Sequence, residues 1–298
     1  FESEQISFFE MTVGMAFDHF RESQVDYAIV EVGLGGRLDA TNIIMPVLSV
    51  ITNIGLDHTE FLGTTRTQIA KEKAGIIKSG TPVVVGQKDE ETQKVFEEIA
   101  LQQSSKLTFV KVQDQDWETD LKGVYQVQNI QTVLTALACL NDPKINLHTI
   151  KQGFKNVISN TGLLGRWQII ADSPQLILDV GHNKEGLSFL VTELQKLEFD
   201  HLHLIMGFVK GKKVVDLISL FPSEASFYLS SPKIDRAIPL STLKAELTES
   251  SKNIDFFPAV IDALNKARSS ANTNDLILVC GSTFVVAEVL NFIKNQKV

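Results

Sequence analysis

Residues 28–42 read AIVEVGLGGRLDATN, and this stretch is the starting point for the fold prediction. A run of apolar, mostly β-branched residues reaches Glu31 and then passes into a loop with three glycines. Similar runs follow at 48–52, 82–86 and 107–112, with helical patterns between them. Strands rich in valine and isoleucine that alternate with helices are typical of a parallel sheet covered on both faces. The sequence therefore predicts an α/β fold, with a buried strand at 26–32.

The alternation continues in the second half of the chain. Two consecutive helices are predicted at 128–140 and 147–157, and the segment SNTGLLG at 159–165 is rich in turn formers. Further strands are then predicted at 167–170, 176–180, 202–206, 225–229 and 276–280, with helices between them. We therefore expect two domains, 1–160 and a smaller one at 161–298.

Composition excludes several classes of protein. The chain has 36 acidic and 28 basic residues, a net charge of −8, and no basic stripe, which argues against nucleic-acid binding. No apolar run approaches the roughly 18–20 residues of a membrane span. The two cysteines, Cys139 and Cys280, lie in apolar runs, so we expect buried thiols and a reducing, cytoplasmic compartment. No signal peptide follows Phe1. Because a natural chain normally begins with Met and this one begins with Phe1, the sequence is expected to be a fragment or to have lost its start.

Polar side chains follow two of the predicted strands directly. Glu31 ends the first, and Asp57 and His58 lie in the segment TNIGLDHTEFLG after the second. In open α/β sheets, ligands collect beyond the carboxyl ends of the strands, so these residues are candidate ligands of a divalent metal ion. The residues alone leave two alternatives open. The glycine loop suits a structural turn equally well, and a single histidine is more often a hydrogen-bonded structural residue.

The second half offers a comparable group. Arg166 follows the turn-rich segment, Asp179 ends a predicted strand, and His182 comes three residues later. An arginine suits phosphate because its planar fork donates two parallel hydrogen bonds. Asp179 could alternatively cap a helix that begins near residue 184. We interpret His201 and His203 as exposed strand residues.

Longer segments identify a family resemblance. VEVGLGGRLDATN, TNIGLDHTEFLG and KEKAGIIKSGTPVVVG occur in order up to residue 86, and YQVQNIQTVLTAL, GRWQ, LDVGHN and CGSTFVVAEVL follow. The sequence resembles bacterial folylpolyglutamate synthase, often bifunctional with dihydrofolate synthase, of the Mur ligase superfamily. The resemblance covers nearly the whole chain. It implies a P-loop-like ATPase domain with a parallel sheet, truncated at its N-terminus, and then a smaller Rossmann-like domain.

The resemblance also implies a reaction. ATP would phosphorylate the carboxylate of a folate or of dihydropteroate, and the amine of L-glutamate would attack the acyl phosphate to give an amide, ADP and phosphate. The implied partners are these small molecules, without nucleic acid or membrane, and the implied state is a cytoplasmic monomer. Two Mg²⁺ ions are expected in the intact enzyme.

By the same resemblance, four residues of the first domain have expected roles. Glu31 and His58 would bind the Mg²⁺ nearest the γ-phosphate. Lys73 would be carbamylated by CO₂ and would orient that metal, which makes it a catalytic residue. Asp39 would face the pterin. From the residues alone, Lys71 and Lys73 both read as solvated helix charges.

Five later residues have implied roles as well. Asn129, Arg166 and Asp179 would contact ATP. His182, as a second catalytic residue, and Ser282 would border the glutamate pocket.

The sequence also departs from the family pattern. No G-x-x-x-x-G-K-[ST] loop is present, and GFVKGKK at 207–213 does not satisfy that pattern, so the chain as written is expected to be a poor ligase or none. The family's Asp-Gly-Ala-His-Asn-Pro reads DVGHNK at 179–184. Two alternatives stay open: another Mur-type amide ligase, or a non-catalytic nucleotide-binding module.

Overall fold

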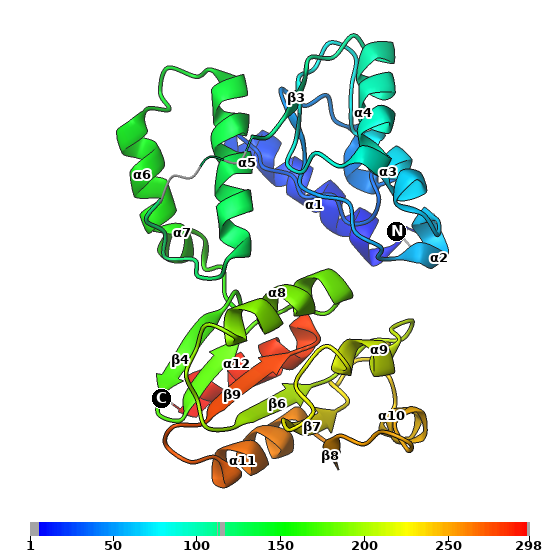
Figure 1. The fold of residues 1–298 in the computed structure, drawn as a ribbon. Helices are drawn as coiled ribbons and strands as arrows, with labels where there is room; N and C mark the ends of the chain where they lie inside the picture. Colours follow the sequence, from blue (N-terminus) through cyan, green and yellow to red (C-terminus); the bar gives the residue numbers. More distant parts are fainter. Residues whose placement is uncertain (1–5, 112, 114–116, 297–298) are drawn as a thin grey trace. The chain divides into compact units, whose positions relative to one another are not determined.

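The computed structural model describes residues 6–111, 113 and 117–296. The chain divides into two compact units, drawn in Figure 1. The first comprises residues 1–115 and 127–146, and the second comprises 116–126 and 147–298. Residues 147–160 thus pack with the second unit, although the sequence prediction puts them in the first domain. Each unit is described by itself below.

The first unit contains a parallel sheet of β1 (Ser49–Ile51), β2 (Val83–Val85) and β3 (Leu107–Phe109), in that order. Its core joins these strands to buried residues of the helices, among them Ile69 and Phe96. The helices are α1 (Phe8–Ser23), α2 (Thr59–Leu62), α3 (Arg66–Ala74), α4 (Glu90–Gln102) and most of α5 (Tyr125–Leu140), with the 3₁₀ turn η1 (Ala40–Ile43). α1 and α3 begin at capping boxes, which satisfy the first amides of each helix.

The strand predicted at 26–32 is wrong. In the structure this segment is irregular and mostly exposed, and the side chain of Ile29 is 96% exposed. A strand needs a neighbour that satisfies its backbone amides and carbonyls, and none of the described strands pairs with this segment. Glu31 consequently lies in an exposed connection and not at a strand end.

The second unit contains a six-stranded sheet in the order β4-β5-β9-β6-β7-β8. β4 (Gln168–Asp172) is antiparallel to β5 (Gln175–Leu178), and the other neighbours are parallel. The remaining strands are β6 (Leu202–Met206), β7 (Ser226–Ser230), β8 (Asn253–Phe257) and β9 (Leu276–Cys280). The helices are α6 (Leu147–Lys155), α7 (Val157–Thr161), α8 (Lys184–Leu194), α9 (Val214–Ile218), α10 (Leu240–Glu246), α11 (Val260–Ser270) and α12 (Thr283–Gln296).

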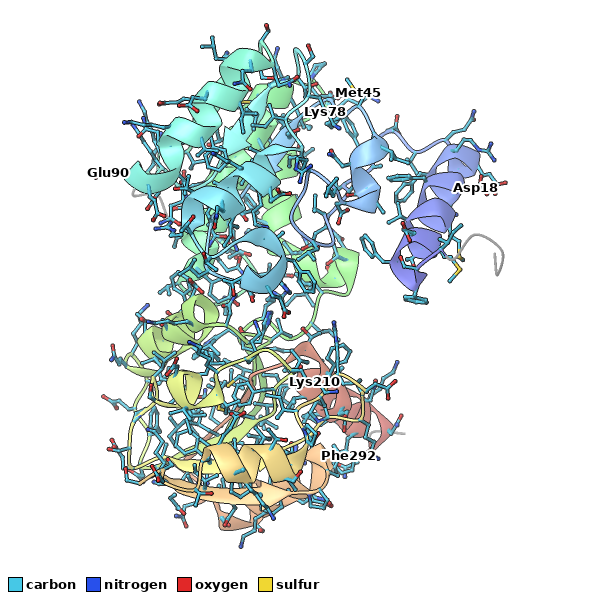
Figure 2. All side chains as sticks on the ribbon, turned by 90° about the vertical axis from the view of Figure 1, so that its right-hand side faces the viewer. Asp18, Met45, Lys78, Glu90, Lys210 and Phe292 are labelled. Carbon is cyan, nitrogen blue, oxygen red and sulfur yellow. The ribbon has the colours of Figure 1, made fainter. Side chains whose placement is uncertain are left out.

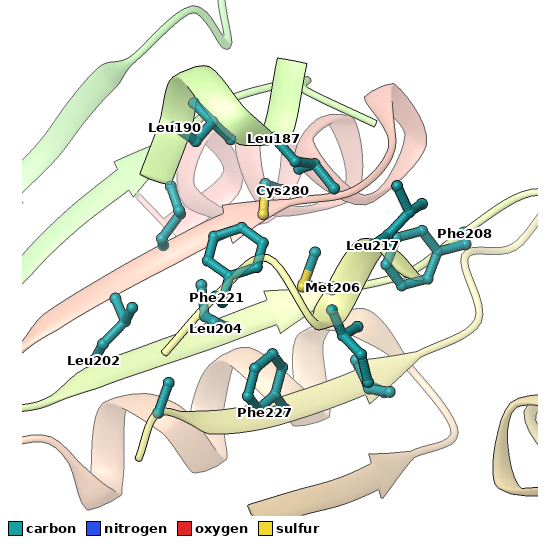
Figure 3. Close-up of a cluster of buried hydrophobic side chains, with 14 of the residues drawn as sticks. Leu187, Leu190, Leu202, Leu204, Met206, Phe208, Leu217, Phe221, Phe227 and Cys280 are labelled. Carbon is teal, nitrogen blue, oxygen red and sulfur yellow. The ribbon is translucent and has the colours of Figure 1, made fainter. Parts of the chain in front are cut away.

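Both faces of this sheet are buried, which explains its nearly continuous apolar strands. Leu204 and Met206 of β6 belong to a cluster with residues of α8, α9 and α10, while Ile205 packs with α11 and α12. Cys280 is fully buried in the first cluster, as predicted, and Figure 3 shows it between α8 and the sheet. Cys139 is only partly buried, so the prediction of a buried thiol is wrong for this residue. Among the described residues, no helix combines the length and the apolar character needed to cross a membrane.

The prediction that His203 is exposed is wrong. Only 3% of this residue is accessible, because β6 lies inside the sheet between β9 and β7 and both of its faces are covered. Its imidazole is hydrogen-bonded to the hydroxyl of Tyr228 at 2.9 Å and to the carboxylate of Asp275 at 3.3 Å.

The sequence did not predict β8 and α10. The sequence of β8, NIDFF, is only partly buried, because this strand lies at the edge of the sheet.

Candidate active site

The glycine loop of the first unit docks on the C-terminal end of α3. The amide of Arg37 donates to the carbonyl of Glu72 at 2.8 Å, and the Arg37 guanidinium contacts the Glu72 carboxylate at 3.1 Å. A Cβ on Gly36 would lie 2.9 Å from the carbonyl oxygens of Glu72 and Lys73. Glycine is therefore required at Gly36 for this close approach.

Three further contacts complete the docking. A Cβ on Gly35, whose φ is +69°, would lie 2.8 Å from the Leu62 side chain of α2. The Asn42 amide donates to the carbonyl of Gly75 at 3.0 Å, and Lys78, labelled in Figure 2, donates to the carbonyl of Asn42 at 2.8 Å. The structure thus packs together all three of the first unit's family-like segments.

Asp39 organises the glycine loop from within. One oxygen accepts from the Thr41 amide at 2.9 Å and from its hydroxyl, and the other accepts from the Leu34 amide at 2.8 Å. Partial burial favours the protonated carboxyl, but hydrogen bonds from Thr41, Leu34 and Gly33 outweigh it and hold the pKa of Asp39 below its usual range. A carboxylate has lone pairs for further donors, so it can also meet a ligand.

Lys73 is a half-buried amine near the C-terminal end of α3. Burial lowers the pKa of Lys73 because the ammonium loses solvation, and the nearby charge of Asp57 opposes this shift. His58 follows Asp57 in the left-handed conformation, with φ +51°, and its amide donates to the Asp57 carboxylate at 2.9 Å. The side chains of His58 and Lys71 are exposed, and for Lys71 this confirms the solvated interpretation.

The side chains that the structure describes do not form a complete metal site by themselves. Within the described part of the chain, no three histidine, cysteine or acidic residues are grouped so that they could hold a metal ion. Any cation at Glu31 and His58 would therefore take further ligands from water, from phosphate or from a modified side chain.

Arg166 lies in a tight turn of the second unit, between two residues with positive φ. These are Gly165 at +72° and Trp167 at +46°. The Trp167 amide donates to the Asp179 carboxylate at 2.7 Å, and the Val180 amide donates to the carbonyl of Gly165 at 2.9 Å. Asp179 therefore fixes the turn that carries Arg166.

Asp179 is buried just beyond the C-terminal end of β5. Besides Trp167, it accepts from the Tyr125 hydroxyl at 3.0 Å and from the Gly181 amide at 2.8 Å. Burial raises the pKa of Asp179, although these hydrogen bonds and the charge of Arg166 oppose the shift. The alternative role as a helix cap is wrong, because Asn183 caps α8 by accepting from the Gly186 amide at 2.8 Å.

The loops after β5 and β9 are tied together. The Gly281 amide donates to the carbonyl of Gly181 at 2.8 Å. Nδ1 of His182 lies 3.0 Å from the carbonyl of Val180, a pairing that requires the proton on Nδ1. Ser282 is buried, and its hydroxyl accepts from the Phe284 amide at 3.2 Å.

The predicted residues thus fall into two groups. Arg166, Asp179, His182 and Ser282 gather at the C-terminal ends of β5 and β9 in the second unit, while the other predicted residues, Asn129 among them, belong to the first. Sequence reasoning gave no role to Tyr125. The sequence shows only that Tyr125 is an aromatic residue near the start of a helix. This does not indicate a hydrogen bond to Asp179, which lies 54 positions later in the chain.

Comparisons with known proteins identify relatives of the whole chain. The chain matches the Mur ligase middle domain over residues 3–170 and the Mur ligase glutamate ligase domain over residues 165–283. It is 33% identical to a dihydrofolate synthase/folylpolyglutamate synthase of Buchnera aphidicola, over 98% of this chain and 72% of that protein.

Solved structures are similar as well. "E. coli FolC in complex with ADP" is 29% identical with a TM-score of 0.86, over 98% of this chain and 73% of that one. A bifunctional folylpolyglutamate synthase/dihydrofolate synthase with Mn, AMPPNP and L-glutamate bound is 29% identical with a TM-score of 0.85, over 97% of this chain and 72% of the other.

Proposed function

This chain belongs to the Mur ligase family, among the dihydrofolate and folylpolyglutamate synthases, which are ATP-dependent glutamate ligases, and we propose that its residues perform this reaction through an acyl phosphate. The γ-phosphate of ATP is transferred to the carboxylate of a folate or of dihydropteroate. The amine of L-glutamate then displaces phosphate and forms the amide.

One observation carries the proposal for this chain's own residues. The glycine loop, the segment that contains His58 and the end of α3 with Lys73 pack against one another through Gly35, Gly36 and Arg37. Three segments that are separate in the sequence thereby bring carboxylate, imidazole and amine groups into one unit. Such a set of groups suits phosphoryl transfer, in which positioning and charge stabilisation do most of the work.

Glu31 and His58 would hold a Mg²⁺ ion. Their donor types fit a divalent cation, and both side chains are exposed to solvent in the described structure. Mg²⁺ usually takes one or two protein ligands and completes its shell with water and phosphate, which agrees with the lack of a three-residue cluster among the described residues. When bound, the ion would reduce the repulsion between ATP and the carboxylate of the substrate.

Lys73 would be carbamylated. The ammonium first loses one proton. The neutral amine then attacks the carbon of CO₂, a C–N bond forms while one C=O π bond breaks, and a second proton leaves the nitrogen, so a cation becomes an anion with two oxygen ligands. Only the unprotonated amine can attack, and the lowered pKa of Lys73 increases that fraction at neutral pH. The resulting carbamate would orient Mg²⁺.

The remaining residues would bind the substrates. Arg166 and Asp179, with Asn129, would contact ATP. The Val180 carbonyl fixes the ring of His182, and His182 and Ser282 would border the glutamate pocket.

Asp39 would shape the glycine loop and offer its remaining lone pairs to the pterin donors. The ligands are small anions, and we propose that the protein acts on them as a cytoplasmic monomer.

An isotope experiment on the full-length protein tests the acyl phosphate. The folate carboxylate is labelled with ¹⁸O, and the phosphate released during turnover is analysed by mass spectrometry. We expect each phosphate to carry one labelled oxygen, because the carboxylate oxygen attacks the γ-phosphorus while the bond to ADP breaks. Unlabelled phosphate would mean that water attacks ATP, and the proposal would fail.

A further inference from the structure

The carboxylate of Asp179 is held by donors from three separate segments of the second unit. Two are the backbone amides of Trp167 and Gly181, and the third is the phenol hydroxyl of Tyr125 at 3.0 Å. Tyr125 and Trp167 donate to the same oxygen. The Tyr125 side chain therefore helps to hold the buried carboxylate of Asp179, together with two backbone amides.

Tyr125 is itself held in place by packing. A Cβ on Gly123, whose φ is +106°, would lie 2.8 Å from the Tyr125 ring. The ring also contacts Phe189 of α8, with centroids 6.1 Å apart. Burial and the charge of Asp179 raise the pKa of Tyr125, so the phenol stays protonated and keeps donating at neutral pH.

The turn at Arg166 needs such an anchor. Trp167 has a positive φ of +46°, a conformation that a large L-residue adopts only when its surroundings impose it. The imposed contact is the bond from the Trp167 amide to Asp179. A displacement of this carboxylate would therefore loosen the turn and move Arg166.

We propose that Tyr125 is a positioning residue of the nucleotide site: its hydroxyl orients Asp179, and Asp179 holds the turn that presents Arg166. This inference rests on the proposed roles of Asp179 and Arg166 in ATP binding. Tyr125 need not touch the nucleotide itself.

The test is ADP binding by isothermal titration calorimetry in the full-length protein. Tyr125→Phe removes the hydroxyl and keeps the ring that packs on Phe189. We expect the Kd for ADP to rise about tenfold, which is about 1.4 kcal/mol. The matched control is Tyr228→Phe, which removes another phenol bond within the same unit, from His203, and should leave ADP binding unchanged.

A double-mutant cycle separates positioning from a general structural role. Asp179→Asn should weaken ADP binding, and Tyr125→Phe should add no further loss in that background. If Asp179→Asn weakens binding while Tyr125→Phe does not, or if the two losses add, the inference is wrong and the proposed function stands. If Asp179→Asn leaves ADP binding unchanged, the assigned nucleotide role of Asp179 fails, and the inference fails with it.

Discussion

Lys73 is the residue whose chemistry depends most on its surroundings. The sequence alone indicates that the Lys73 ammonium is a solvated charge on a helix. In the structure, however, Lys73 is half-buried and the charge of Asp57 is nearby. Two neighbouring lysines of one helix therefore differ, because Lys71 is exposed. Burial lowers the pKa of Lys73 and so makes its reactive neutral amine more available.

This difference gives a prediction for the full-length enzyme. Lys73→Ala should lower turnover by about a hundredfold or more, since an anion that orients the transferring phosphoryl group is lost. Acetate should partly restore activity by supplying a carboxylate in the vacated space, and Lys71→Ala should behave like the wild type. A carbon-13 spectrum under labelled CO₂ checks the carbamate directly. A free ammonium at Lys73 in active, Mg²⁺-loaded enzyme would refute the assignment.

Helices and strands that are specified by their own residues could be predicted from the sequence. α1 has Ser7 and Glu10 at its capping box, and β9 is an unbroken apolar run. Properties that depend on partners could not be predicted. None of the described strands pairs with segment 26–32, and His203 is buried because β6 lies between two strands. The same holds for the candidate site. The sequence indicates which residue types could bind ligands, but the hydrogen bond from Tyr125 to Asp179 depends on the fold and could not be predicted.

The buried pair of His203 in β6 and Asp275, just before β9, predicts a pH effect on stability. Burial lowers the pKa of His203, although Asp275 opposes the shift, and His201 adds repulsion. An unfolded histidine titrates near pH 6.5, so below that pH the unfolded chain binds more protons and the free energy of unfolding falls. One proton gives a slope of at most about 1.4 kcal/mol per pH unit.

His203→Gln should flatten this slope between pH 7 and 5, and His201→Gln should change it less. Urea unfolding followed by tryptophan fluorescence is the measurement, because Trp117 and Trp167 are the only tryptophans and both belong to the second unit. An unaltered slope in His203→Gln would assign the pH dependence to other groups.

At the scale of the whole molecule, the net charge of the protein has the same sign as the charges of its substrates. The chain carries a net charge of −8, while ATP, folates and glutamate are all anions. Overall electrostatics therefore does not attract the substrates, and local groups such as Arg166 and a bound cation must offset the repulsion. Binding should accordingly depend on a few cationic positions and on Mg²⁺.

The central claim is that this protein joins glutamate to a folate at the expense of ATP. The most direct measurement incubates the full-length protein with ATP, Mg²⁺, radiolabelled L-glutamate and either dihydropteroate or a tetrahydrofolate, and separates the products by chromatography. We predict that label enters the folate product in a one-to-one ratio with ADP formed, and only when all components are present. ADP formation without labelled folate, from either acceptor, would contradict the account.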